Sequence, residues 1–174
     1  MIAITPNSVT AYVADSGSDT VTPITTATNK AGTAITVGNS PDAITITPNG
    51  NTAYVANSLS NSVTPITTAT NKALKAIKVG ALPQAIAITP NGATAYVPDR
   101  SSGTVTPITT ATNKAGTAIN LGGNPWALVI TPSGKKAYVA NDGTDAVDPI
   151  TTATNKAGTA IGVGNSPIGI AITP

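Results

Sequence analysis

Short runs of alternating apolar and polar residues, separated by turn residues, follow one another along the whole chain. Ala43–Thr47 alternates and is rich in β-branched residues, which predicts a strand, and Pro48–Gly50 after it predicts a tight turn. Three similar runs follow, separated by polar loops. The predicted strands, named A to D in chain order, are residues 43–47, 52–56, 63–68 and 74–79.

The same pattern returns every 42 residues. Thr22–Ala31 recurs unchanged at 64–73 and 106–115, and with Asp148 replacing its first threonine at 148–157. Such a period is typical of repeat proteins whose units need neighbours to bury their faces. The chain is therefore predicted to be one array over residues 1–174, with units at 1–42, 43–84, 85–126 and 127–168.

Four-stranded units at this period predict an all-β fold, a β-propeller with four 42-residue blades. Neighbouring apolar side chains such as Tyr12 and Val13 point to opposite faces of a strand, so adjacent blades must cover both faces. A parallel β-solenoid is the structural alternative, although its coils are shorter and lack four hairpin turns. Pro23 and its equivalents fall inside strand C, where we expect a bulge or a local break.

Composition limits the chemistry. Nine Lys and Arg residues against seven Asp give a net charge of +2, without the dense basic stripe that nucleic acid requires. The chain has no His, Cys or Glu, so the usual general bases, thiolates and His or Cys metal ligands are missing. We expect no enzyme, no cofactor and no nucleic-acid partner. We also expect neither a signal peptide nor membrane insertion.

Tyr54–Asn57, Thr68–Lys72 and Ile46–Gly50 resemble the YVTN-type β-propeller repeat of archaeal and bacterial surface-layer and secreted proteins. The resemblance covers the whole chain. It implies a binding module at the cell surface or outside the cell, and some related propellers are lactonases or lyases. The Asp that usually follows the strand C isoleucine is replaced here by Thr25, Thr67, Thr109 and Thr151.

The last six residues, Gly169–Pro174, repeat Met1–Pro6 except at the first position, so strand A is encoded five times. Four blades alone leave two open flanks. We expect Ile168–Thr173 of one chain to fill the inner position of blade 1 in a second chain. Two chains would then close an eight-bladed ring as a homodimer. A four-bladed monomer with an internal clasp is the alternative.

Differences among the four copies predict a partner-binding face. The A–B turns and C–D loops barely change, whereas the B–C loops and the residue after the D–A proline do, and in a propeller these variable segments share the face that rings the channel. The predicted residues are Asp42, Gln84, Trp126 and Ile168 after the prolines, and Asp15, Asp19, Asn57, Asn61, Asp99, Arg100, Asn141, Asp142 and Asp145 in or beside the B–C loops.

Charge divides along the same line. All seven Asp lie at or next to the variable face, and the C–D loop lysines lie opposite, which predicts an acidic and a basic face. Asp15–Asp19 and Asp142–Asp145 have oxygen ligands suited to Ca²⁺, but we favour Asx turns there, because neither loop has a third carboxylate and the chain has no Glu. Trp126 is either a stacking platform for a sugar or peptide side chain, or local packing.

The sequence thus predicts a non-catalytic β-propeller scaffold for binding or assembly in a cell-surface or secreted protein, homodimeric, with a protein or carbohydrate ligand. Two alternatives stay open. One is a truncated or engineered propeller fragment that self-assembles without a ligand. The other is a lactonase-like or lyase-like propeller enzyme.

Overall fold

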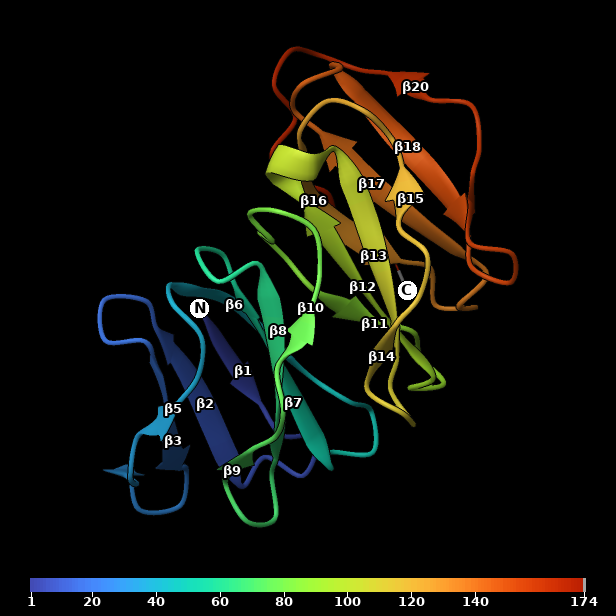
Figure 1. The fold of residues 1–174 in the computed structure, drawn as a ribbon. Helices are drawn as coiled ribbons and strands as arrows, with labels where there is room; N and C mark the ends of the chain where they lie inside the picture. The colour runs from blue at the N-terminus through green and yellow to red at the C-terminus, as the bar shows by residue number, and fades with distance from the viewer. Residues whose placement is uncertain (174) are drawn as a thin grey trace.

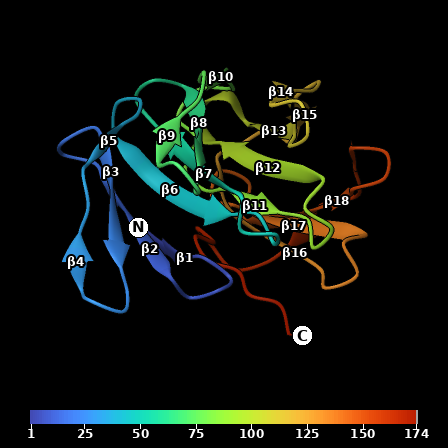
Figure 2. The same cartoon turned by 90° about the horizontal axis from the view of Figure 1, so that it is seen from below.

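The computed structural model describes residues 1–173 and contains four antiparallel sheets, one for each repeat. The sheets follow one another in chain order (Figure 1), with inner strands on the concave side of an arc and outer strands at its convex rim (Figure 2). The arc does not close into a ring. The prediction of an all-β chain with four antiparallel blades is confirmed, and closure to eight blades stays a prediction.

Each blade has inner strands A, B and C and an outer strand D in two short pieces. Blade 1 has β1 (Ile2–Ile4), β2 (Thr10–Asp15), β3 (Thr20–Thr25), β4 (Lys30–Ala31) and β5 (Ile35–Thr36). Blade 2 has β6 (Pro41–Ile46), β7 (Thr52–Asn57), β8 (Ser62–Thr67), β9 (Lys72–Ala73) and β10 (Ile77–Lys78). Blade 3 has β11 (Ala87–Ile88), β12 (Thr94–Asp99), the 3₁₀ turn η1 (Arg100–Ser102), β13 (Thr104–Thr109), β14 (Lys114–Ala115) and β15 (Ile119–Asn120). Blade 4 has β16 (Pro125–Ile130), β17 (Lys136–Asn141), β18 (Ala146–Thr151), β19 (Lys156–Ala157) and β20 (Ile161–Gly162).

In blades 2 and 3 the hairpin between strands A and B is closed by the sequence Thr-Pro-Asn-Gly. In blade 2 the Gly50 amide donates to the Thr47 carbonyl at 2.8 Å, and Asn49 Oδ1 accepts from the Asn51 amide at 3.0 Å. Gly50 has a φ of 75°, in the left-handed region that glycine adopts without a steric penalty. The turn sequence therefore sets where strand A ends and strand B begins.

The proline of strand C interrupts the outer strand rather than its own. β2 and β3 pair in an unbroken register through Tyr12 and Pro23. In an antiparallel pair the nitrogen and carbonyl of one residue point to the same side, and the Pro23 carbonyl accepts from the Gly32 amide at 2.7 Å, on the strand D side. The missing N–H thus faces the gap between β4 and β5, where no ladder partner is needed. The expected break exists, but it lies in strand D.

The hydrophobic core lies between blades rather than within them. The face of blade 1 toward blade 2, here called its forward face, consists of Tyr12, Ala14, Val21 and Ile35. It packs on the rear face of blade 2, which consists of Ile44, Ala53, Val55 and Ile66. Equivalent clusters join blade 2 to blade 3 and blade 3 to blade 4. Each blade is therefore stabilised by its neighbours, as the repeat predicts.

A tyrosine hydrogen bond crosses each of these joints. Tyr12 Oη donates to Asn71 Oδ1 of blade 2 at 2.6 Å and lies 3.3 Å from the Thr68 carbonyl oxygen. The same pairing recurs between Tyr54 and Asn113 and between Tyr96 and Asn155, again at 2.6 Å. Burial raises the pKa of all three tyrosine hydroxyls, so they remain protonated donors. We call this contact the tyrosine latch.

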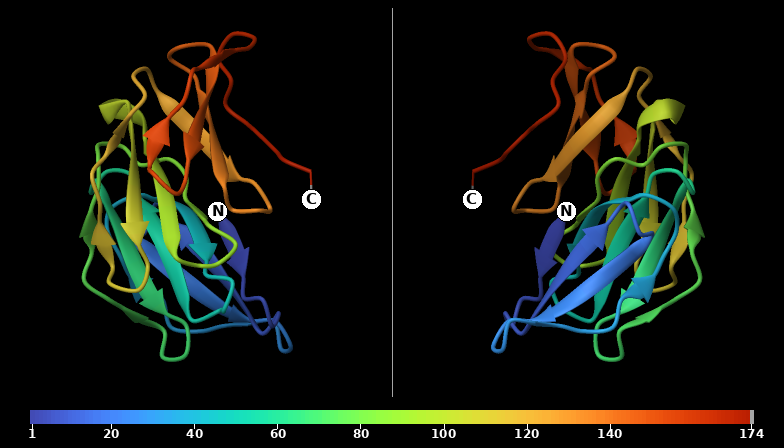
Figure 3. Two further views of the ribbon diagram at one scale, coloured as in Figure 1. Left: turned by 90° about the vertical axis from the view of Figure 1, so that its right-hand side faces the viewer. Right: turned by 90° about the vertical axis from the view of Figure 1, so that its left-hand side faces the viewer.

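The C-terminal copy of strand A forms no strand within residues 164–173, and these residues leave blade 4 as an extended coil (Figure 3). The inner position of blade 1 is filled by β1 from the N-terminus, which pairs with β2. The internal clasp is therefore not formed in the part of the chain that the structure describes, and Pro174 lies outside it. No helix among residues 1–173 is long and apolar enough to cross a membrane.

We predict that Tyr54 and Asn113 are energetically coupled. In a double-mutant cycle of Tyr54→Phe and Asn113→Gly, urea denaturation should give a coupling free energy of about 1 kcal/mol, the net worth of one hydrogen bond. Glycine suits position 113 because Asn113 has a φ of 53°. Tyr54→Phe with Asn71→Gly, which belong to different latches, is the control and should be additive. Additive effects in both cycles would contradict the latch.

Candidate functional site

The variable segments lie together on one face of the arc. In blades 2, 3 and 4 the D–A and B–C loops are joined by backbone hydrogen bonds: Ser58 to Ser40 at 2.9 Å, Arg100 to Leu82 at 3.1 Å, and Asp142 to Asn124 at 3.1 Å. In each case the B–C loop amide donates to the D–A loop carbonyl. Residues of these loops and of the first strand A positions are called the variable face below.

Three predicted residues stand where the inner strand is distorted. Asp42 and Trp126 are bulged residues, because the register shifts between Pro41 and Ala43 and between Pro125 and Ala127. Gln84 follows Pro83, which forms an isolated bridge with Asp99. Bulges redirect side chains and are frequent beside active sites. All three side chains are half-buried, whereas Ile168 is exposed beyond the last blade.

Four predicted residues at the end of strand B mainly stabilise their own blades. Asn57, Asp99 and Asn141 are fully buried, and Asp15 is half-buried. Asn57 Nδ2 donates to Thr64 Oγ1 at 2.9 Å, while Asp99 Oδ2 accepts from Thr106 Oγ1 at 2.6 Å. Asp15 Oδ2 accepts from Thr22 at 2.6 Å in the same way, and Asn141 donates to Asp148 at 2.8 Å. These side chains hold strands B and C together beneath the face.

Three more predicted residues shape the D–A loops. The Oδ1 atoms of Asp19, Asn61 and Asp145 accept from the amides of residues 40, 82 and 166, at 2.8, 2.9 and 2.9 Å. All three have a positive φ. The two Asp-rich loops therefore act as local backbone caps, and within residues 1–173 no three His, Cys, Asp or Glu side chains gather as a metal site would require.

Arg100, Trp126 and Asp142 form a side-chain cluster on the variable face that joins blades 3 and 4. The Arg100 guanidinium carbon lies 4.3 Å from the centroid of the Trp126 ring, within cation–π range. Its Nη2 lies 3.7 Å from Asp142 Oδ2. Arg100 comes from η1 of blade 3, Trp126 from β16 and Asp142 from the B–C loop of blade 4. The three side chains thus sit at the joint between blades 3 and 4.

The cluster keeps polar groups available. The Arg100 and Asp142 side chains are 34% and 20% exposed, so both reach solvent. Arg100 Nε is buried without a hydrogen-bond partner among the described residues. A guanidinium has five N–H donors, and one ion pair at 3.7 Å leaves most of its exposed donors for a carbonyl oxygen or an anion. The arrangement can therefore bind and polarise an oxygen next to a carboxylate.

Asp99 is a buried carboxyl group directly before Arg100. Burial raises its pKa to about 6, and the hydroxyl groups of Thr106 and Thr104 donate to it and limit the rise. Its Oδ1 has no hydrogen-bond partner among residues 1–173. Because Asp99 is fully buried, it does not contact a ligand on the face, and its protonation instead affects stability.

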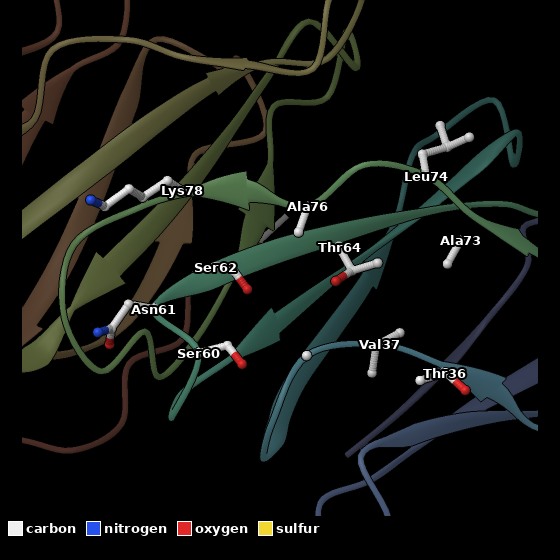
Figure 4. Close-up of a pocket in the computed structure, with 11 residues that line it drawn as sticks. Thr36, Val37, Ser60, Asn61, Ser62, Thr64, Ala73, Leu74, Ala76 and Lys78 are labelled. Atoms are coloured by element: carbon white, nitrogen blue, oxygen red, sulfur yellow. The ribbon is translucent and has the colours of Figure 1, made fainter.

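A groove of about 550 Å³ lies outside this cluster, between the outer parts of blades 1 and 2 (Figure 4). Thr36, Val37, Ser60 and Leu74 are among the residues that line it, and Lys78 is the one charged residue of the lining. It contains no carboxylate and none of the bulged residues. The groove follows from the shape of the joint, and we place no chemistry there.

The chain matches the model of the lactonase, 7-bladed β-propeller family over residues 1–159, and it belongs to this family. No curated protein matches it. Hydrazine synthase of Kuenenia stuttgartiensis is similar in structure, with a TM-score of 0.87 and 28% identity over 92% of this chain and 47% of that chain. A functionally unknown protein of Desulfotomaculum acetoxidans gives 0.81 and 22% identity, over 98% of this chain and 59% of that one.

A putative 6-phosphogluconolactonase of Bacteroides uniformis is also similar, with a TM-score of 0.80 and 17% identity over 96% of this chain and 55% of that chain. A second such protein, from Bacteroides fragilis, gives 0.79 and 21% identity, over 97% and 55%. At these identities the two likenesses show the fold. The chain spans about half the length of the solved structures it matches.

The family match corrects two predictions. The non-catalytic scaffold and the exclusion of an enzyme are wrong, because the family points to a lactonase-like propeller, which the sequence left as an alternative. The expectation of a propeller family is confirmed, although the match is to the lactonase family and not to the YVTN-type repeat itself. The cell-surface location, the homodimer and the binding role of individual residues stay predictions.

We predict that Asp99 makes folding stability depend on pH. Its folded-state pKa of about 6 lies above the usual 3.8, so the folded protein binds this proton more tightly than the unfolded chain does. Proton binding by Asp99 therefore stabilises the folded state fully below pH 3.8, and this stabilisation is lost as the pH rises through about 6. The free energy of unfolding changes by at most about 3 kcal/mol through this group. Asp99→Asn should therefore raise the free energy of unfolding at pH 8 and change it little at pH 4.

Asn57, the equivalent residue of blade 2, shows that an amide fits this environment. Denaturant titrations of the wild type and Asp99→Asn between pH 4 and 8 test the prediction. Asp15→Asn makes the same change at the half-buried equivalent in blade 1 and controls for the loss of one negative charge. An equal effect of Asp99→Asn at both pH values would contradict it.

Proposed function

We propose that this chain supplies four blades of a lactone-hydrolysing propeller, with its reaction site at Arg100, Trp126 and Asp142 on the variable face. The observation that carries the proposal is the Arg100 guanidinium held on Trp126 beside the Asp142 carboxylate. Membership of the lactonase family supports the reaction class. The bulge at Trp126 supports the location, because β-bulges are frequent beside active sites.

Lactone hydrolysis needs two groups that this cluster contains. A water oxygen attacks the carbonyl carbon, negative charge develops on the carbonyl oxygen, and the ring carbon–oxygen bond then breaks to give a hydroxy acid. Arg100 is suited to stabilise the developing oxyanion through its free N–H donors. Asp142 is suited to accept the proton of the attacking water and to return it to the ring oxygen. Trp126 positions the guanidinium by stacking.

The charge of the face supports an uncharged lactone as substrate. Six of the seven Asp, at positions 15, 19, 42, 99, 142 and 145, lie on or directly beneath the variable face, and Arg100 is its one cation among residues 1–173. The lysines of the C–D loops lie on the opposite face. A phosphorylated lactone would meet a repulsive field except at Arg100. We therefore propose a sugar lactone without a phosphate group.

The repeat sequence Tyr54–Asn57 supports a place among the YVTN-type proteins, and with it a cell-surface or secreted location. Fractionation of cells that produce the native protein tests this location. Recovery in the cytoplasm alone would contradict it.

We predict that the purified chain accelerates hydrolysis of glucono-δ-lactone, measured as acid release in a weakly buffered indicator assay. Arg100→Gln should lower kcat/KM by about 10²-fold, the effect of removing one oxyanion donor. Asp142→Asn should also lower kcat. Lys114→Gln, on the opposite face, is the charge control and should leave the rate unchanged.

Hydrolysis no faster than the spontaneous reaction would overturn the proposed activity. Activity that survives Arg100→Gln would overturn the site but not the reaction. A preference for the 6-phosphorylated lactone would overturn the substrate class, because the acidic face predicts the reverse.

A further inference from the structure

The two ends of the arc carry complementary halves of the joint that the chain builds three times. The forward face of blade 4 consists of Tyr138, Ala140, Val147 and Ile161, the equivalents of Tyr12, Ala14, Val21 and Ile35. In blade 1 this set is buried, with Tyr12 only 1% exposed. In blade 4 Ile161 is 50% exposed and Tyr138 and Val147 are half-buried. This face has no blade against it within residues 1–173.

The rear face of blade 1 is the matching surface. Its members Ile2, Ala11, Val13 and Ile24 are the equivalents of Ile44, Ala53, Val55 and Ile66, which bury the forward face of blade 1. Ile2 is 58% exposed, and Val13 and Ile24 are half-buried. The latch is divided between the ends in the same way. Tyr138 lacks an asparagine from a following blade, and Asn29, with the same φ of 53° as Asn71, lacks a tyrosine from a preceding blade.

We propose that these two faces dock on each other between two copies of this chain, so that Tyr138 of each copy donates to Asn29 of the other. The partner is a second copy because its exposed rear face carries the same residue types, at the same repeat positions, as the surfaces that receive the forward faces of blades 1 to 3. Two such joints, related by a two-fold axis, close a ring of eight blades. The inference does not depend on lactone hydrolysis.

The C-terminal segment supports this docking. The Asp145 side chain already accepts from the Ser166 amide at 2.9 Å, as Asp19 does from the Ser40 amide at 2.8 Å, so the D–A loop after blade 4 begins like the others. Residues 167–172 are the equivalents of the six-residue strands β6 and β16, whereas β1 has three residues. In the pair, residues 167–172 replace β1 of the second copy and form the longer inner strand.

A ring of eight requires about 45° between neighbouring blades, against about 51° in a ring of seven, and both lie within the range of propellers. Closure by two copies therefore needs a small opening of each joint relative to the seven-bladed family. If the joints cannot open by this amount, the closed pair does not form. The same faces would then form open chains or join further blades of a longer protein.

Light scattering on the full chain across a range of concentrations tests the proposal. We expect a particle of about 34 kDa, twice the 17.1 kDa chain. Ile161→Lys should give the monomer with unchanged circular dichroism, whereas Leu59→Lys, at a loop residue that is 68% exposed and away from both faces, should leave the pair intact. A monomer at every concentration, or assemblies larger than two, would overturn the closed pair.

The latch and the strand have separate tests by analytical ultracentrifugation. Tyr138→Phe and Asn29→Gly should each raise the dimer Kd by about 10- to 100-fold, since two hydrogen bonds are lost per pair, and the double variant should add little. Additive effects would overturn the latch.

Ala171→Pro should weaken pairing because it removes an N–H aimed at Tyr12 of the partner copy, while Ala3→Pro, in the strand that is replaced, should be tolerated. The reverse result would overturn the strand exchange.

Discussion

The fold depends on apolar burial between successive sheets. No blade has a core of its own: Tyr12, Val21 and Ile35 of blade 1 become buried only against Ile44, Val55 and Ile66 of blade 2. The tyrosine latch gives this non-directional burial a fixed alignment, because a hydroxyl–amide contact of 2.6 Å tolerates little sliding of one blade over the next. Stability and curvature are therefore set by one joint repeated along the chain.

The same joints position the chemistry. The B–C and D–A loops meet on one face because the strands alternate in direction, and the bulges before Ala43 and Ala127 turn the residue after the proline out of the strand register. Arg100 meets Trp126 only because blade 3 and blade 4 pack side by side. A site built at a joint is thus as rigid as the apolar contact below it, which suits a group that must hold an oxyanion in place.

Much of this architecture could be predicted from the repeat, since period, alternation and turn residues located the strands and the variable face. The break in strand D beside Pro23 could not be predicted, because its position depends on which side of strand C the proline nitrogen faces. The Arg100–Trp126 contact could not be predicted either, because neither residue repeats and 26 positions separate them, although both were predicted on that face. The lack of His, Cys and Glu led to the prediction that the chain is not an enzyme. Arg can nevertheless polarise a carbonyl, and Asp can accept and return a proton.

The divided outer strand affects how molecules of this kind avoid sticking to one another. Along the convex rim each blade ends in two pieces of two residues, and the first piece always begins with a lysine: Lys30, Lys72, Lys114 and Lys156. A β-strand of another molecule could not add to this edge, because the rim has no continuous row of free amides and carbonyls and carries a positive charge in each blade. The proline of strand C, which is buried in blades 1 to 3 and half-buried in blade 4, thus protects the outer rim against amyloid-like growth from a position inside the sheet.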